Sequence, residues 1–171
     1  MTDKINPMRE VRIEKVTLNI GVGEPGDKLE SAFKLLERLT ERKPVRTSTK
    51  KRIPKWNVRP GLILGVKVNI RRDYDKLLKR LLGAVDFNLK KSNFDDSGNV
   101  SFGIDEYIHI PEIKYDPKMP MFGMNVTITL ERRGYRIKRR RLMRKPIGEA
   151  HKVTQEDAIN FMKEKYGVVV A

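Results

Sequence analysis

Residues 11–20 read VRIEKVTLNI, and the fold is decided by the strand that this stretch predicts. Apolar Leu18 and Ile20 alternate with polar Thr17 and Asn19, and this period of two is typical of a β-strand with one buried face. The turn GVGEPG follows and leads into a helical pattern of apolar residues. The chain is therefore expected to begin with a half-buried strand that is followed by a helix.

The same patterns continue along the rest of the chain. Asp27 with Glu30, and Thr154 with Asp157, have the spacing of capping boxes that open helices, and Gly83 is a candidate C-cap. Segments rich in turn-forming residues separate the later elements. The expected helices cover about residues 27–40, 73–82 and 154–166; the expected strands cover residues 44–49, 62–71, 106–113 and 124–131; and the turn-rich part covers residues 86–105.

This order of elements predicts an α+β fold, with an antiparallel β-sheet and helices packed on one face of it. The length of 171 residues predicts a single domain over residues 1–171. Within it we expect a basic extension at about 132–150 and a C-terminal helix at about 154–166.

Positive charge is concentrated in two segments. The chain has 37 Lys and Arg against 22 Asp and Glu, which gives a net charge of +15. Residues 43–72 contain ten basic residues and residues 132–145 contain nine, and neither segment contains an acidic one. The remainder is slightly acidic, with 18 basic and 22 acidic residues. A polyanion is the usual partner of such surfaces, so a basic, polar face turned toward RNA is expected; a generally basic thermophilic surface is the alternative.

Several other classes of function are disfavoured. The chain has no cysteine, which excludes disulfides, zinc fingers and thiol nucleophiles. No apolar run reaches the roughly 18–20 residues that span a bilayer, and the N-terminus lacks the pattern of a signal peptide. His109 and His151 are isolated and match no catalytic motif. We therefore expect no cofactor, no metal site, no membrane and no small-molecule substrate.

Polar side chains on the expected strands form the first candidate RNA site. Lys67, Asn69 and Arg71 share one face of the strand at residues 62–71, and Thr17 and Asn19 would extend this face if the first strand is a neighbour. An ordinary hydrated sheet face is the alternative.

Two basic segments form the other candidates. In residues 46–59, Trp56 is the only tryptophan and lies among cations and prolines, where it would stack on RNA or else belong to the core. Residues 132–141 combine Tyr135 with many cations, as expected of an arm that orders on RNA or of a flexible basic loop.

The turn at residues 21–26 also matches GxGxxG, the pattern of a dinucleotide site. Glu24 and Asp27 place negative charge where a pyrophosphate would bind, which argues against such a site. An RNA-modifying enzyme with a basic substrate-binding surface is the alternative function, and this turn is its one candidate cofactor site.

Four blocks of the sequence resemble the ribosomal protein L5 family of the large subunit, whose members bind 5S rRNA. They are IEKVTLNIGVGEPGDKLESAFKLLERLTERKPVRT, KKRIPKWNVRPGLILGVKVNIR, FGIDEYIHIPEIKYDPKMPMFGMNVTITL and RRGYRIKRRR. The short N-terminus and the basic stretch after the last strand resemble the archaeal type.

The resemblance implies a structural protein of the large ribosomal subunit, cytoplasmic and ribosome-bound, located in the central protuberance. Its implied partners are 5S rRNA, 23S rRNA, P-site tRNA and neighbouring ribosomal proteins, including one in the small-subunit head. One departure is Pro60, where bacterial members have a glutamine, which removes a hydrogen-bonding side chain.

The resemblance and the charge pattern together give the expected site residues. For 5S and 23S rRNA these are Asn19, Arg46, Thr47, Lys50, Lys67, Asn69, Arg71, Arg136, Arg139 and Arg140. For the loop that contacts P-site tRNA they are Arg52, Lys55, Trp56 and Arg59.

Overall fold

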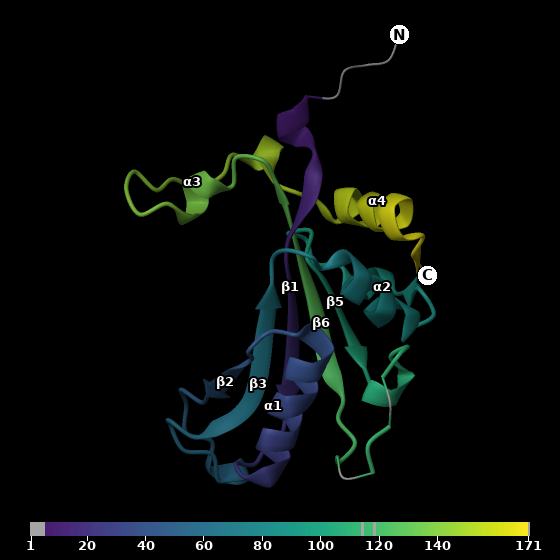
Figure 1. Ribbon diagram of the computed structural model, residues 1–171. Coiled ribbons are helices and arrows are strands. Elements are labelled where there is room, and N and C mark those ends of the chain that lie inside the picture. The colour runs from purple at the N-terminus through teal and green to yellow at the C-terminus, as the bar shows by residue number, and fades with distance from the viewer. Residues whose placement is uncertain (1–5, 114, 118, 171) are drawn as a thin grey trace.

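Five antiparallel strands form the central sheet of the computed structural model, which describes residues 6–113, 115–117 and 119–170 (Figure 1). The strands are β1 (Val11–Gly21), β2 (Val45–Ser48), β3 (Ile63–Ile70), β5 (Val100–Ile104) and β6 (Met124–Arg132). Their order across the sheet is β2-β3-β1-β6-β5, so the first strand occupies the centre. The α+β fold and the antiparallel sheet are thereby confirmed.

Two helices, α1 (Asp27–Thr40) and α2 (Asp75–Gly83), lie on one side of this sheet (Figure 1). α4 (Gln155–Tyr166) contacts β1 and the short strand β7 (Val169–Val170), which pairs in parallel with β4 (Asn88–Leu89). α3 (Arg136–Arg139) is a single turn that projects away from the sheet (Figure 1). The remaining short 3-10 helices are η1 (Pro7–Arg9), η2 (Pro54–Trp56), η3 (Lys91–Asn93), η4 (Tyr107–His109) and η5 (Glu149–His151).

The core forms because strand alternation and helix periodicity turn apolar side chains toward each other. Leu18 and Ile20 of β1 are fully buried, as are Leu36 of α1 and Leu81 of α2. All of these belong to one cluster of buried residues that also includes Met162 of α4. α1 and α2 do not cover the opposite face of the sheet.

A β-bulge interrupts the alternation near the start of β1. Ile13 pairs with Leu130 of β6, but the next pair is Lys15 with Thr129, so Glu14 is an extra residue on β1. A bulge bends its strand and redirects a side chain. Here both Ile13 and Val16 are buried although they are three residues apart.

The predicted strand at residues 106–113 is wrong. This segment forms η4, and Tyr107 and Ile110 are both about 1% exposed, a spacing of three that belongs to a 3-10 turn. The Tyr107 N–H donates to the Phe122 carbonyl at 3.1 Å, which ties the segment to the chain that enters β6. The strand of this region, β5, lies instead at Val100–Ile104, inside the expected turn-rich part.

The predicted helix ends are correct in part. The capping box of Thr154 and Asp157 is confirmed at the start of α4. The capping box of Asp27 and Glu30 is wrong, because the N-cap of α1 is Gly26, whose φ of 127° suits glycine, and no side chain caps the helix. Gly83 is the last residue of α2 and Ala84 is its C-cap.

Candidate nucleic-acid interface

Polar side chains line up across the uncovered side of the sheet. Asn19 of β1 pairs with Lys67 of β3 on one side and with Asn125 of β6 on the other. In the next row Thr17 pairs with Asn69 and with Thr127. Directly paired residues of antiparallel strands point to the same side of a sheet, so these residues form one surface. This polar face comprises Lys15, Thr17, Asn19, Thr47, Lys67, Asn69, Ser101, Asn125, Thr127 and Thr129.

Hydrogen bonds fix part of the polar face. The Thr17 hydroxyl donates to the Asn69 Oδ1 at 2.9 Å, and the Ser101 hydroxyl donates to the Thr127 Oγ1 at 3.2 Å. Lys67 and Asn69 are exposed, and among the described residues no carboxylate pairs with Lys67. The face thus offers an ammonium group beside amides and hydroxyls, which is the chemistry that binds phosphates and sugars.

The expected neighbourhood of Thr17, Asn19, Lys67 and Asn69 is therefore confirmed. Ser101, Asn125 and Thr127 continue the same rows and were not among the residues predicted for this site. The alternation in MNVTITL, residues 124–130, already marked the last two as facing away from the core. Arg71 follows β3 directly and is exposed.

Arg46 and Thr47 lie on opposite sides of the sheet. Thr47 pairs with Gly65 and belongs to the polar face, and an added Cβ at Gly65 would lie 2.9 Å from the Thr47 Oγ1. Glycine at this position therefore allows β2 and β3 to pack with Thr47 in place. Arg46 pairs with buried Val66 and points to α1 instead, where it forms a 2.6 Å ion pair with Glu30. The structure does not bring Arg46 together with the other expected rRNA residues.

The loop between β2 and β3, residues 49–62, is held by backbone hydrogen bonds. Ile53 and Val58 exchange two of them, at 2.9 and 3.1 Å, and the Thr49 hydroxyl donates to the Arg59 carbonyl at 2.6 Å. Val58 is 6% exposed and anchors the loop, whereas Trp56 is 69% exposed. The interpretation of Trp56 as a core residue is therefore wrong. The expected cations of this loop, Lys50, Arg52, Lys55 and Arg59, are all exposed.

The basic arm, residues 132–145, lies at the other end of the polar face. β3 and β6 are both antiparallel to β1, so the loop that precedes β3 and the arm that follows β6 lie at opposite ends of the sheet (Figure 1). Arg136 and Arg140 are exposed on the arm. Arg139 is bound to the carboxylates of Glu14 and Glu131.

A hollow of about 620 Å³ separates the arm from the polar face. Lys15, Thr127 and Thr129 line it from the sheet, and Lys138 and Arg139 line it from the arm. Glu14 and Asp95 also contribute to its wall. The arm and the sheet thus share one concavity, with cations on both sides of it.

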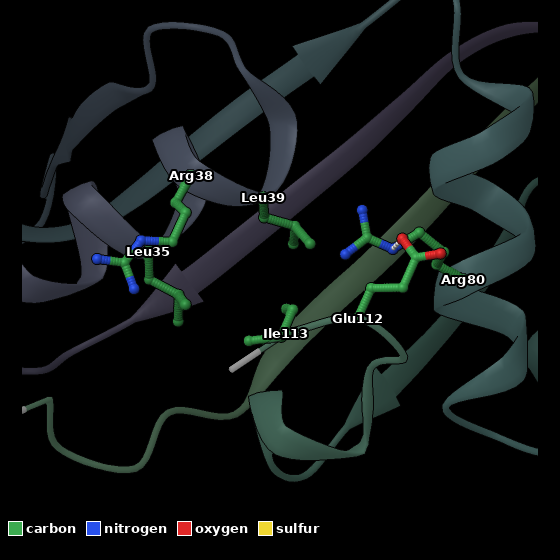
Figure 2. Close-up of a pocket in the computed structure, with 6 residues that line it drawn as sticks. All are labelled: Leu35, Arg38, Leu39, Arg80, Glu112 and Ile113. Atoms are coloured by element: carbon green, nitrogen blue, oxygen red, sulfur yellow. Dashed lines mark ion pairs between the residues drawn. The ribbon is translucent and has the colours of Figure 1, made fainter. Parts of the chain in front are cut away.

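A second hollow, of about 350 Å³, lies on the helix side of the sheet (Figure 2). Leu35 and Leu39 of α1 line it together with Ile113, and Arg80 of α2, which also lines it, pairs with Glu112 at 3.3 Å. These side chains include no nucleophile and base in contact, so the hollow has no catalytic arrangement.

The described residues contain no group of three or more His, Asp or Glu side chains that could hold a metal ion. Within the same residues, no helix has the length and hydropathy needed to cross a bilayer.

Comparison with known proteins identifies the family. The model described as Ribosomal protein L5 matches residues 6–59, and the model of the C-terminus of the same ribosomal family matches residues 63–161. The chain is 51% identical over 167 residues to the large ribosomal subunit protein uL5 of Nanoarchaeum equitans, which covers 96% of this chain and 98% of the relative. It is 49% identical over 168 residues to uL5 of Sulfolobus acidocaldarius, with 98% and 94% covered.

Both family models describe ribosomal proteins, so the class to which this chain belongs is that of the structural proteins of the ribosome. Within this class the chain belongs to the ribosomal protein L5 family, and the two relatives above are archaeal. The family consists of structural proteins, so the alternative of an RNA-modifying enzyme is set aside.

Proposed function

We propose that this protein is a structural constituent of the large ribosomal subunit and binds 5S rRNA with its polar face. The observation that carries the proposal is a row of paired residues across the sheet. Lys67 of β3 lies next to β2 on one side and pairs with Asn19 of β1 on the other, and Asn19 pairs in turn with Asn125 of β6. Such a row presents donors and acceptors at the spacing of neighbouring strands, roughly 5 Å. The relatives are named as large-subunit proteins, which supports the assignment to the ribosome and to the cytoplasm.

Both ends of the polar face extend the proposed rRNA site. At the end near β2 we assign Thr47 and Lys50 to it, and at the other end Arg71 and the arm. Within the arm, Arg136 and Arg140 are the exposed cations suited to phosphates of 5S or 23S rRNA. Arg139 belongs to the same arm. Arg46 is separate from this surface, because it contacts α1.

The exposed loop between β2 and β3 is proposed to reach P-site tRNA. Trp56 offers a flat apolar surface, and Arg52, Lys55 and Arg59 add positive charge around it. Stacking on a nucleoside and contact with phosphates are the interactions that these side chains provide. In the assembled ribosome we place the protein in the central protuberance, in contact with neighbouring ribosomal proteins that include one of the small-subunit head.

A binding titration tests the proposal. The purified protein is titrated against 5S rRNA and against an unrelated RNA duplex of the same length over a range of salt concentrations. We expect a clear preference for 5S rRNA, and a log–log salt slope of about −0.7 to −0.9 for each phosphate neutralised.

Lys67→Gln is then compared with Lys34→Gln, which makes the same change of charge on exposed α1. The Lys67 variant should lose affinity for 5S rRNA and the Lys34 variant should keep it. Equal affinity of the unmodified protein for the two RNAs at moderate salt would rule the function out.

A further inference from the structure

A buried carboxylate lies where the arm leaves the sheet. Glu131, the second-last residue of β6, is 3% exposed. Its Oε1 accepts from the Nε and Nη2 of Arg12 at 3.0 and 2.6 Å. Its Oε2 accepts from the Nη2 of Arg139 at 2.6 Å. The Glu131 carboxylate thus joins Arg12 of β1 to Arg139 of the arm, and Arg139 lies eight positions after Glu131 in the chain.

The bulge in β1 adds a second acceptor at the same place. Glu14 is the extra residue of the bulge, and its carboxylate accepts from the other terminal nitrogen of Arg139. A regular strand would have no extra residue here and would place its side chains in strict alternation. The Arg139 guanidinium is therefore held by two carboxylates that come from two different strands.

The start of the arm is fastened to the C-terminal part of the chain as well. The Tyr135 hydroxyl accepts from the Val153 N–H at 2.9 Å, and Arg132 forms a 2.7 Å ion pair with Asp157. Asp157 also completes the capping box of α4. The part of the arm that follows Tyr135 carries Arg136, Lys138, Arg140 and Arg141, which are exposed.

Two carboxylates beneath an RNA-binding arm weaken the attraction between the arm and RNA, because they repel phosphates. A buried carboxylate also has a large desolvation cost that only well-placed partners offset. Fixing the arm in one conformation before binding compensates for both effects, since a flexible basic segment loses conformational entropy when it binds RNA.

We propose that Glu131 and Glu14 are positioning residues that hold the arm, through Arg139, in the conformation that binds RNA. The inference rests on the proposed function and extends it. Arg139 is the anchor of the arm, and the neighbouring exposed cations meet the phosphates. The arm is accordingly ordered in the free protein.

The direction of the change in affinity separates this inference from a simple effect of charge. Glu131→Gln and Glu14→Gln each remove one negative charge, so charge alone predicts tighter binding to any RNA. Loss of the fixed arm predicts weaker binding to 5S rRNA in spite of the added positive charge. Glu112→Gln, on the helix side of the sheet, makes the same change of charge away from the arm and serves as the matched control.

The experiment measures affinity for 5S rRNA and for an unrelated duplex, together with amide hydrogen exchange of the free full-length protein. The amides to follow are those of Arg140 and Lys145, which donate to the carbonyls of Arg136 and Ile137 at 2.8 and 3.3 Å. In both arm variants we expect faster exchange at these amides and about five- to tenfold weaker binding to 5S rRNA. The Glu112 variant should behave like the unmodified protein in both measurements.

Glu131→Gln disturbs a buried group, so a melting curve accompanies it. If that variant does not fold, Glu14→Gln decides alone, because it leaves both contacts of Glu131 in place. Variants that bind 5S rRNA as tightly as the unmodified protein, or more tightly, overturn the inference, and so do arm amides that exchange at the original rate. If the unmodified protein itself shows no preference for 5S rRNA, the proposed function fails instead.

Discussion

The guanidinium carbon of Arg46 lies 5.6 Å from the centroid of the Phe33 ring. Both residues are on the helix side of the sheet, and Glu30 of α1 binds the same guanidinium at 2.6 Å. A cation over an aromatic ring beside a carboxylate is a stable surface contact. It attaches the edge strand β2 to α1, and it directs the charge of Arg46 away from the polar face.

Arg46→Gln should therefore change the affinity for 5S rRNA by less than about twofold and leave the salt slope unaltered, whereas Lys67→Gln should make the slope shallower by about 0.7 to 0.9. The stability cost of Arg46→Gln should be at most about 1 kcal/mol, because the ion pair is exposed. Titrations at four salt concentrations measure both slopes. A shallower slope for the Arg46 variant, equal to that of the Lys67 variant, would contradict the assignment of Arg46 to the helix side.

Trp56→Ala should leave both folding and binding to 5S rRNA nearly intact. The indole is 69% exposed and the loop is held by Val58 and by backbone hydrogen bonds, so little buried surface is lost. Contact with P-site tRNA should weaken, since stacking on an aromatic side chain contributes about 1–3 kcal/mol per base. Chemical footprinting of tRNA on ribosomes reconstituted with the variant measures this contact. Equal losses for 5S rRNA and tRNA would contradict the division of the surface.

Val58→Ala is the matched control within the same loop. Its side chain is 6% exposed, so truncation should loosen the loop and lower the melting temperature while Trp56 remains present.

Sequence patterns predicted those elements whose period is strong and local. The alternation around Leu18 and the helical spacing around Leu36 gave β1 and α1, and the pattern at residues 124–131 gave β6. They failed between β5 and β6. EYIHIPEI is rich in residues that favour strands, but Tyr107 and Ile110 are buried three positions apart because the segment folds back onto the core. This tertiary packing leaves no alternating pattern of apolar and polar residues in the sequence.

The polar face could be predicted only strand by strand. The exposed positions of β1 and β3 follow from alternation, but their pairing does not, because the order β2-β3-β1-β6-β5 depends on contacts between distant parts of the chain. Asn125 was missed for this reason. The contacts of Arg139 with Glu14 and Glu131 were also beyond prediction, since they depend on a bulge that the sequence of β1 does not mark.

The single domain expected over residues 1–171 leads to a prediction about unfolding. One cluster of buried residues includes Leu18 of β1, Leu81 of α2 and Met162 of α4, so we propose that these parts unfold together. Calorimetry of the unmodified protein should show one transition, with equal calorimetric and van't Hoff enthalpies. Two separate transitions would contradict this.

Leu18→Ala should lower the stability of the whole chain by about 2–5 kcal/mol, because Leu18 is fully buried in the central strand. Far-UV circular dichroism is a suitable probe of urea unfolding here, since exposed Trp56 reports little on the core.

Tyr166 connects α4 to α2, and its ionisation should make stability depend on alkaline pH. Its hydroxyl donates to the Asp75 Oδ1 at 2.8 Å, and burial together with this hydrogen bond raises the pKa of Tyr166 above the ordinary value of 10.0. The folded state therefore retains the proton more strongly than the unfolded state does. The resulting stability is complete below about pH 10 and is lost as the pH rises above it, because the unfolded chain ionises first.

Tyr166→Phe should cost about 1 kcal/mol at neutral pH, from the lost hydrogen bond. Above pH 10 the difference between the two proteins should shrink, because the phenylalanine has no proton to lose. Urea unfolding of both proteins at intervals from pH 7 to pH 11 measures this difference, and the comparison removes the effects of titrating groups that do not interact with Tyr166. A difference that stays constant or grows with pH would show that the buried hydroxyl is not held in its neutral form by the contact with Asp75.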